Sequence, residues 1–221
     1  MPESALLEKP AFPVIFIVVL SLVFVGVLAF VYRLNEPGIE KQKQEAYERT
    51  VLSLCADSLA SLTGKTAEQI QSGYPQSFRD YVKILPDGSF PRKAFEVRFK
   101  GRLLAYVFDI TGKGLWGTMR ALVATDPAKT TVLGVNVYDQ VETPGLGARI
   151  GEDWFTSQFK RKAIMVNGVP VKFILIPEGQ APTDPTQVRQ VTGASITSNA
   201  VIHMLQSELA MIAKASGEKK L

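Results

Sequence analysis

The chain has 221 residues, of which 46% are hydrophobic and 21% are charged, and its formal net charge is +4. This length allows one domain of ordinary size with additional segments. Because the net charge is modest and Lys and Arg are spread along the chain, nucleic-acid binding is not indicated. The single cysteine, Cys55, and the single histidine, His203, exclude a disulfide within the chain and argue against a metal site built by this chain alone.

The first element is an uncharged segment near the start of the chain. Residues 11–32 consist mainly of Val, Ile, Leu, Phe and Ala, and about 20 apolar residues suffice to span a bilayer. Pro13 lies where proline does little harm to a helix, and Tyr32 and Arg33 form an interfacial pair at the end. A cleaved signal peptide is the alternative, but its apolar region is shorter and no small-residue cleavage site follows. We expect a flank over residues 1–12 and one transmembrane helix over residues 13–32.

The charges around this segment give a weak topology signal. The N-terminal flank has Lys9 against two glutamates, whereas Arg33, Lys41 and Lys43 follow the apolar run. The positive-inside rule alone would keep the large domain in the cytoplasm.

The next segment is expected to lead away from the membrane as a helical linker over residues 33–62. From residue 39 it is rich in Glu, Lys, Gln, Ala and Leu, which are good helix formers, and Cys55 is expected to be a small buried hydrophobe there. Residues 72–88 hold Gly, Pro, Asp and Ser at close intervals and are expected to form loops.

The central part of the chain contains five β-like runs, at residues 95–99, 103–110, 115–125, 131–137 and 171–177. A turn at residues 126–129 predicts an antiparallel hairpin between two of them. Residues 154–162 suit a short helix, and Asn167 with Gly168 signals a tight turn. Strands flanked by helices, rather than alternating with them, predict an α+β fold with a mostly antiparallel sheet. We place this domain at residues 63–213 and a polar tail at residues 214–221.

Small and hydroxyl-bearing residues precede the last amphipathic stretch: Thr192, Gly193, Ala194, Ser195, Ile196, Thr197 and Ser198. Glycine lets the backbone approach a ligand closely. Hydrophobic residues then recur at helical spacing, at Val201, Ile202, Leu205, Leu209 and Ile212, so a helix is expected to begin between residues 195 and 198. The N-terminus of such a helix favours an anion. An ordinary capping sequence is the alternative, since Ser and Thr are preferred helix caps.

This segment resembles the flavinylation motif of FMN-binding domains, Ser/Thr-Gly-Ala-Ser/Thr-x-Thr. In that family the last Thr carries FMN through a phosphoester bond, so the resemblance implies covalent FMN on Thr197. The block from Glu142 to Ile150, followed by Asp153, Trp154 and Phe155, resembles one found in the G component of the Rnf electron-transport complex and in the C component of the Na⁺-translocating NADH:quinone oxidoreductase. Residues 112–117 match the Gly-rich turn that opens the first sheet strand in both components. The three segments follow one another in the family's order over residues 100–213.

The chain departs from the family pattern at Arg189. The family usually has an acidic residue three places before the first hydroxyl of the motif. The resemblance implies that this acid orients the loop or helps to position metal and flavin nucleotide in the modifying enzyme. Arg189 either pairs with an FMN phosphate, for which a planar guanidinium is well suited, or is a solvated loop residue.

The resemblance implies an FMN site without catalytic or metal-binding residues. Besides Thr197, the residues expected to contact FMN belong to the motif and to two turns: Thr192, Gly193, Ala194, Ser195, Ser198, Glu142, Thr143, Gly145, Leu146, Leu115 and Trp116. Leu115 and Trp116 are expected to cover a ring face, with core packing as the alternative for Trp116. A hydrogen bond within its turn is the expected role of Glu142.

The implied function is that of an electron-carrying subunit with covalent FMN in an Rnf-type ion-translocating ferredoxin:NAD oxidoreductase. The implied location is the bacterial cytoplasmic membrane, with a single pass and the FMN domain on the extracytoplasmic side, against the charge signal. The implied partners are other membrane and redox subunits, the lipid bilayer and a flavin transferase. Because no nicotinamide-binding fingerprint is present, the chain alone is not expected to oxidise NADH.

Two alternatives stay open. Total length and residues 148–155 look more like the Rnf component, whereas Leu115 and Trp116 look more like the component of the quinone-reducing relative. An anchored assembly or binding module without covalent flavin is the other alternative, and Arg189 favours it.

Overall fold

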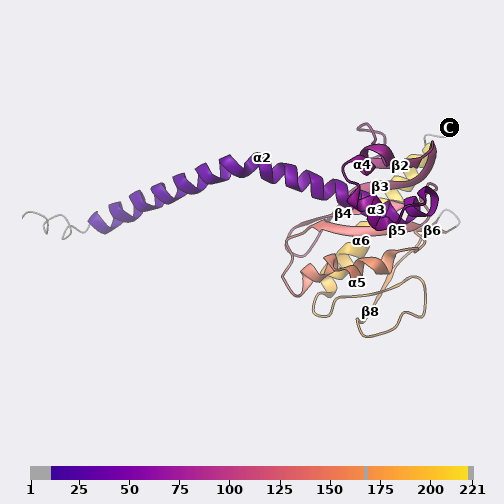
Figure 1. The fold of residues 1–221 in the computed structure, drawn as a ribbon. Coiled ribbons are helices and arrows are strands. Elements are labelled where there is room, and N and C mark those ends of the chain that lie inside the picture. Colours follow the sequence, from indigo (N-terminus) through magenta and orange to yellow (C-terminus); the bar gives the residue numbers. More distant parts are fainter. Residues whose placement is uncertain (1–10, 167–168, 219–221) are drawn as a thin grey trace, which may run out of the picture. The chain divides into compact units, whose positions relative to one another are not determined.

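The computed structural model describes residues 11–166 and 169–218, and it divides into two compact units, Met1–Ala46 and Tyr47–Leu221. The helices are α2 (Ala11–Thr63), α3 (Ala67–Ser72), α4 (Gln76–Tyr81), α5 (Asp153–Thr156) and α6 (Ser195–Glu218), with 3-10 helices η1 (Gly147–Gly151) and η2 (Ser157–Phe159). Figure 1 shows these elements along the chain.

The central element of the second unit is a five-stranded antiparallel sheet with the order β1-β2-β3-β4-β5. Its strands are β1 (Val82–Ile84), β2 (Ala94–Phe99), β3 (Arg102–Lys113), β4 (Thr118–Thr125) and β5 (Val132–Asp139). Two small sheets accompany it: antiparallel β6 (Met165–Val166) and β7 (Val169–Pro170), and parallel β8 (Ile174–Ile176) and β9 (Gln187–Arg189).

Both faces of the sheet are covered, because successive strand side chains point to opposite sides. On β4, Met119, Ala121 and Val123 belong to one core with α6, whereas Leu122 and Ala124 belong to a second core. The second core contains buried residues of the last part of α2, including Val51, Leu52, Cys55 and Leu59. The sheet therefore lies between α6 and residues of α2 that belong to the second unit (Figure 1). This arrangement confirms the predicted α+β fold.

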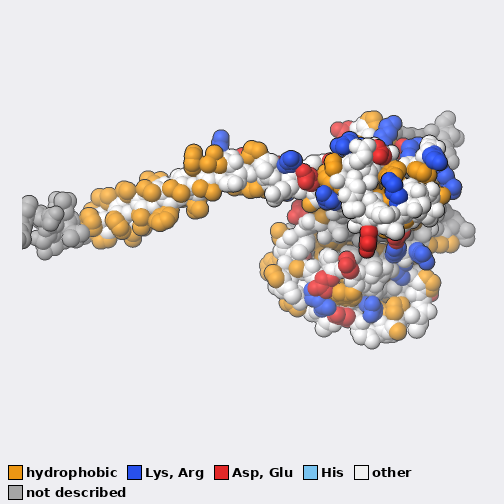
Figure 2. All heavy atoms as spheres, viewed as in Figure 1, with side chains coloured by type: hydrophobic (Ala, Val, Ile, Leu, Met, Phe, Trp, Pro, Cys, Tyr) orange, Lys and Arg blue, Asp and Glu red, His pale blue; other side chains and the backbone are white. Residues whose placement is uncertain are grey.

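Helix α2 is continuous from Ala11 to Thr63 and contains Pro37, so the expected membrane segment and linker form one helix. Among the described residues it is the helix that is long and apolar enough to cross a membrane, with a mean hydropathy of 3.3 in its most apolar 18-residue window. Large side chains such as Phe24 and Leu28 are exposed in this part, and Figure 2 shows hydrophobic groups along it. Water is a poor environment for such a surface, which suits a bilayer instead.

Several local expectations are confirmed. The turn after residue 125 joins β4 and β5, which pair antiparallel. Helix α6 begins at Ser195, and the residues expected on its apolar face are buried: Val201, Ile202, Leu205, Leu209 and Ile212. Cys55 is fully buried, and this burial raises the pKa of its thiol to about 12. The tight turn expected at Asn167 and Gly168 lies outside the described residues.

Other expectations were wrong in detail. Residues 72–88, expected to be loops, contain α4 and β1, because elements of six and three residues are too short to show a periodic pattern. Leu115 and Trp116, expected in a strand, lie in a turn in which the N–H of Gly114 donates to the carbonyl of Gly117 at 2.7 Å. The expected strand at residues 171–177 is confined to β8, and the helix expected at residues 154–162 is split into α5 and η2. Helix α6 continues to Glu218, into the segment assigned to the tail, while the domain boundaries stay predictions.

The first prediction concerns the anchor. Removing residues 1–33 is expected to release a soluble, folded domain, because the apolar segment is lost while Val51, Leu52 and Leu59 remain in the core. Removing residues 1–63 is the matched control and is expected to prevent folding, since burying each large aliphatic side chain contributes about 1.5–3 kcal/mol. Gel filtration and circular dichroism of both truncations check this. Full-length protein in the soluble fraction without detergent would contradict the anchor.

Candidate functional site

The start of α6 is fixed by hydrogen bonds within its own loop. Gly193 has a φ of +77°, a left-handed conformation that favours glycine. The N–H of Ala194 donates to the carbonyl of Val191 at 3.0 Å, and the N–H of Ser198 donates to the carbonyl of Ala194 at 2.9 Å. The buried Ser198 hydroxyl in turn accepts from the N–H of Val191 at 3.0 Å. Ser198 thus fastens the loop before α6 to the first turn of the helix, and its contact with FMN stays a prediction.

Thr197 faces a carboxylate that comes from a distant turn. Its side chain lies in the first turn of α6 and is only 1% exposed. Its hydroxyl Oγ1 donates to Oε2 of Glu142 at 2.7 Å, across a separation of 55 residues. Glu142 is itself buried. Two of the three segments singled out in the sequence are therefore joined by one hydrogen bond.

The third segment holds the other oxygen of the same carboxylate. The backbone N–H of Trp116 donates to Oε1 of Glu142 at 3.0 Å. A Cβ atom at Gly114 would collide with Oε1, and one at Gly147 would lie 2.9 Å from Oε2 and 3.0 Å from Oγ1 of Thr197. Glycine is needed at both places because the backbone approaches the carboxylate so closely.

The same three segments carry exposed apolar side chains: Leu115, Trp116, Val141, Leu146 and Ile196. Trp116 is 69% exposed, which rules out the core-packing alternative for it. Leu146 lies beside the motif, since a Cβ at Gly193 would be 3.0 Å from its Cδ2. Exposed apolar and aromatic side chains on the segments that meet at this hydroxyl suit a flat ligand.

The turn that carries Glu142 is compact. The carbonyl of Thr143 accepts from the N–H groups of Leu146 and Ala148, each at 3.1 Å. Gly145 has a φ of +74°, and its missing side chain faces open space. The turn buries Glu142 while Thr143, Gly145 and Leu146 are exposed. Ser195, Thr192 and Gly193 are also exposed, whereas Ala194 is buried.

A second carboxylate, which the sequence analysis missed, holds the other end of the motif. Oε2 of Glu178 accepts from the backbone N–H of Thr192 at 2.8 Å, and Oε1 accepts from Nη2 of Arg149 at 2.8 Å. The Arg149 hydrogen bond, followed by those from Thr192, lowers the pKa of Glu178 to about 2. No sequence signal marks Glu178, because it lies in a Pro- and Gly-rich stretch.

Arg189 lies in β9 and contacts Gln158 instead of an acidic partner. Its backbone N–H donates to Oε1 of Gln158 at 2.8 Å, and Nε2 of Gln158 donates to its carbonyl at 3.1 Å. Its guanidinium carbon is 5.8 Å from the centre of the Trp154 ring. The side chain is half-buried, so it is neither a core residue nor a freely solvated one.

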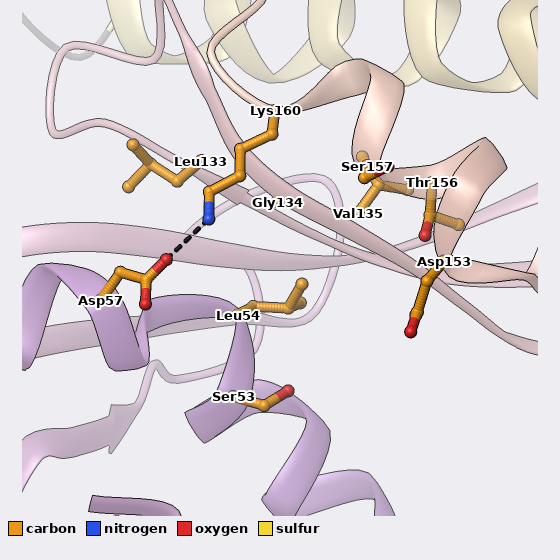
Figure 3. Close-up of a pocket in the computed structure, with 10 residues that line it drawn as sticks. All are labelled: Ser53, Leu54, Asp57, Leu133, Gly134, Val135, Asp153, Thr156, Ser157 and Lys160. Carbon is orange, nitrogen blue, oxygen red and sulfur yellow. Dashed lines mark hydrogen bonds and ion pairs between the residues drawn. The ribbon is translucent and has the colours of Figure 1, made fainter. Parts of the chain in front are cut away.

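A separate cavity of about 200 Å³ lies between α2, β5 and α5 (Figure 3). Nζ of Lys160 donates to Oδ2 of Asp57 at 2.6 Å across it. Its lining contains none of the motif residues, so we do not assign it to FMN.

With this geometry in place, residues 114–210 match the family model of the FMN-binding domain. The chain is 40% identical over 103 residues to the C component of Na⁺-translocating NADH-quinone reductase from Yersinia pestis and 32% identical over 101 residues to that from Pasteurella multocida. Each match covers 46% of this chain and 38% of the relative. The similarity thus spans well under half the length of these relatives.

Two solved structures share the fold. The C component of Na⁺-translocating NADH-quinone reductase from Parabacteroides distasonis superimposes with a TM-score of 0.57 at 23% identity, over 79% of this chain and 94% of that one. NqrC from Shewanella oneidensis gives a TM-score of 0.58 at 22% identity, over 78% of this chain and 99% of that one.

The second prediction concerns Glu178. Because its pKa is lowered from 4.5 to about 2 in the folded state, its interactions contribute stability above the unfolded pKa, and this contribution is lost as the pH falls from 4.5 towards 2. Glu178→Gln is expected to lower the melting temperature at pH 7 and to flatten its decline in this acidic range. Melting of the full chain in detergent from pH 7 to 2 checks this. Glu68→Gln, at an exposed carboxylate on α3, is the control, and an equal effect there would contradict a specific role.

Proposed function

We propose that this chain is a membrane-anchored electron-carrying subunit with covalently bound FMN in an ion-translocating oxidoreductase complex. The observation that carries the proposal is the Thr197 hydroxyl, placed at the start of α6 within the segment that matches the FMN-binding domain. FMN supplies one- and two-electron transfer when it is bound. The chain itself supplies the tether, the ring platform and the membrane attachment.

The residues present fit a tethered FMN. A phosphodiester on Oγ1 of Thr197 would lie at the N-terminus of α6, where a negative group is favoured by about 0.3–1 kcal/mol. Gly193 and Ser195 are exposed and leave room for the phosphate. Exposed Trp116 and Leu146 offer apolar surface to the ring. Because Thr197 is buried in this structure, the attached phosphate requires its hydrogen bond with Glu142 to open.

Two kinds of complex fit the proposal. The length and the segment at residues 148–155 favour an Rnf-type ferredoxin:NAD oxidoreductase, whereas the relatives found by similarity are named as subunits of the Na⁺-translocating NADH-quinone reductase. Isolation of the complex from native membranes and mass spectrometry of its subunits distinguish them. The second readout is the electron donor that reduces the bound flavin in the whole complex. Ferredoxin would indicate the Rnf type, and NADH, with quinone as the final acceptor, would indicate the quinone reductase.

The alternative of an anchored assembly module without covalent flavin rests on Arg189. Arg189 lies in β9 and contacts Gln158 and Trp154. Position 189 therefore lacks the carboxylate that the family usually has there. Under this alternative the same chain reaches the membrane but carries no flavin after denaturation.

The third prediction concerns the FMN acceptor. After coexpression with a flavin transferase, the denatured wild-type protein is expected to fluoresce on a gel, and Thr197→Val is expected to lose this signal. The variant keeps the shape of the side chain but leaves Oε2 of Glu142 without its donor, at a cost of about 1–3 kcal/mol, so the fold is expected to survive. Mass spectrometry of the tryptic peptide that begins at Gln190 locates the adduct.

Ser198→Ala is the matched control, because it removes a neighbouring hydroxyl that has a structural partner. The adduct is expected to persist there, with a lower melting temperature. An adduct that survives in Thr197→Val would show that the acceptor is another residue. A wild-type protein without any adduct would favour the assembly module.

The fourth prediction concerns the side of the membrane. We propose an extracytoplasmic FMN domain, in line with the family resemblance and against the flanking charges. In a Cys55→Ala background, Asp87→Cys introduces an exposed thiol in the second unit. An impermeant thiol reagent is expected to label it in intact spheroplasts, whereas Ser4→Cys, on the other side of the apolar segment, is expected to react only after lysis. The reverse pattern would place the domain in the cytoplasm.

A further inference from the structure

We propose that Glu142 is the base that accepts the proton of the Thr197 hydroxyl when the FMN phosphoester forms. This inference rests on the proposed function and assigns to the chain itself one catalytic residue of its own modification. Its basis is the hydrogen bond in which Oγ1 of Thr197 donates to Oε2 of Glu142 at 2.7 Å, within the range in which a base can take a proton directly.

The chemistry requires such a base. A neutral threonine hydroxyl is a weak nucleophile and needs an adjacent group that removes its proton. In the balanced step, Oγ1 of Thr197 forms a bond to the phosphorus of a flavin nucleotide activated by a pyrophosphate, and the P–O bond of that pyrophosphate breaks. The departing nucleoside monophosphate takes the electron pair, and the hydroxyl proton passes to Oε2 of Glu142. No oxidant or reductant is involved.

The structure orients Glu142 for this role. Its other oxygen, Oε1, is held by the N–H of Trp116 at 3.0 Å, which leaves Oε2 facing the hydroxyl. Gly147 has no side chain beside the two reacting atoms, where an added Cβ would lie 3.0 Å from Oγ1 and 2.9 Å from Oε2. Both Thr197 and Glu142 are buried, so bulk water is a poor competitor for the proton.

The other candidate groups around the motif have different partners. The Ser198 hydroxyl accepts from the backbone of Val191, and the Glu178 carboxylate accepts from Thr192 and Arg149. None of the ion pairs between described residues includes Glu142, and its carboxylate accepts from the neutral Thr197 hydroxyl and the Trp116 N–H. Glu142 is therefore the carboxylate that directly contacts the reacting oxygen.

The fifth prediction tests this assignment with the full-length apoprotein in detergent, an excess of flavin transferase and FAD. Glu142→Gln keeps an acceptor for the Trp116 N–H and a hydrogen-bonding group near Thr197 but has no basic oxygen. Its rate of covalent flavin incorporation, followed by gel fluorescence and intact mass, is expected to fall by about 10²- to 10⁴-fold. Glu96→Gln is the control, because it removes a mostly buried carboxylate on β2 and is expected to leave the rate unchanged.

Two further readouts separate a base from a residue that only positions the threonine. Glu142→Asp, which keeps a carboxylate as a base, is expected to retain more of the wild-type rate than Glu142→Gln does. Formate is expected to restore part of the rate in Glu142→Ala, because a small carboxylate can occupy the space that the side chain leaves. Circular dichroism of each variant verifies the fold.

The outcomes separate the inference from the proposed function. Incorporation into Glu142→Gln at the wild-type rate overturns the inference and leaves covalent FMN intact. A slow Glu142→Gln, with an equally slow Glu142→Asp and no formate rescue of Glu142→Ala, also overturns it, since Glu142 would then only position Thr197. A wild-type protein that never acquires covalent flavin overturns both.

Discussion

The hydrogen bond between Thr197 and Glu142 is the constraint on which the rest of the site depends. It joins the first turn of α6 to the turn after β5, and the second oxygen of the same carboxylate joins both to the turn between β3 and β4. Three segments that are far apart in the sequence therefore meet at one buried carboxylate. The glycines of these turns follow from the same constraint, because Gly114 and Gly147 are the places where any side chain would displace it.

The sheet and α6 bring these segments to the same place. The antiparallel register of β3 and β4 pairs Lys113 with Thr118, which fixes the turn that presents Trp116. A Cβ at Gly112 would lie 2.6 Å from Met204, so glycine in β3 allows α6 to pack closely over the strand just before that turn. The buried face of α6 then sets the rotation of the helix, and with it the direction of Thr197. Packing in the core thus determines which of the neighbouring hydroxyls faces Glu142.

Much of this could be predicted from the sequence, but only where a pattern extends over enough residues. The apolar helix, the apolar face of α6 and the hairpin after residue 125 have clear periodic or turn signals, and the fold class follows from their order. Helix α4 and strand β1 are too short for such signals. Family motifs pointed to the three segments that meet in the structure, and to Thr197, Glu142 and Trp116 within them. The pairing between Thr197 and Glu142, which are 55 positions apart, depends on tertiary packing and is not encoded in any local spacing.

At Arg189, too, the position of a residue in the sequence does not determine which side chains meet in the fold. The family pattern places an acidic residue there, but the parallel register of β8 and β9 sets Ile176 opposite Arg189. Glu178, two residues after Ile176, consequently lies beside the start of the motif. Its carboxylate accepts from the N–H of Thr192 and is held by Arg149. The loop therefore has an acidic side chain that orients it, although the acid comes from the segment after a neighbouring strand.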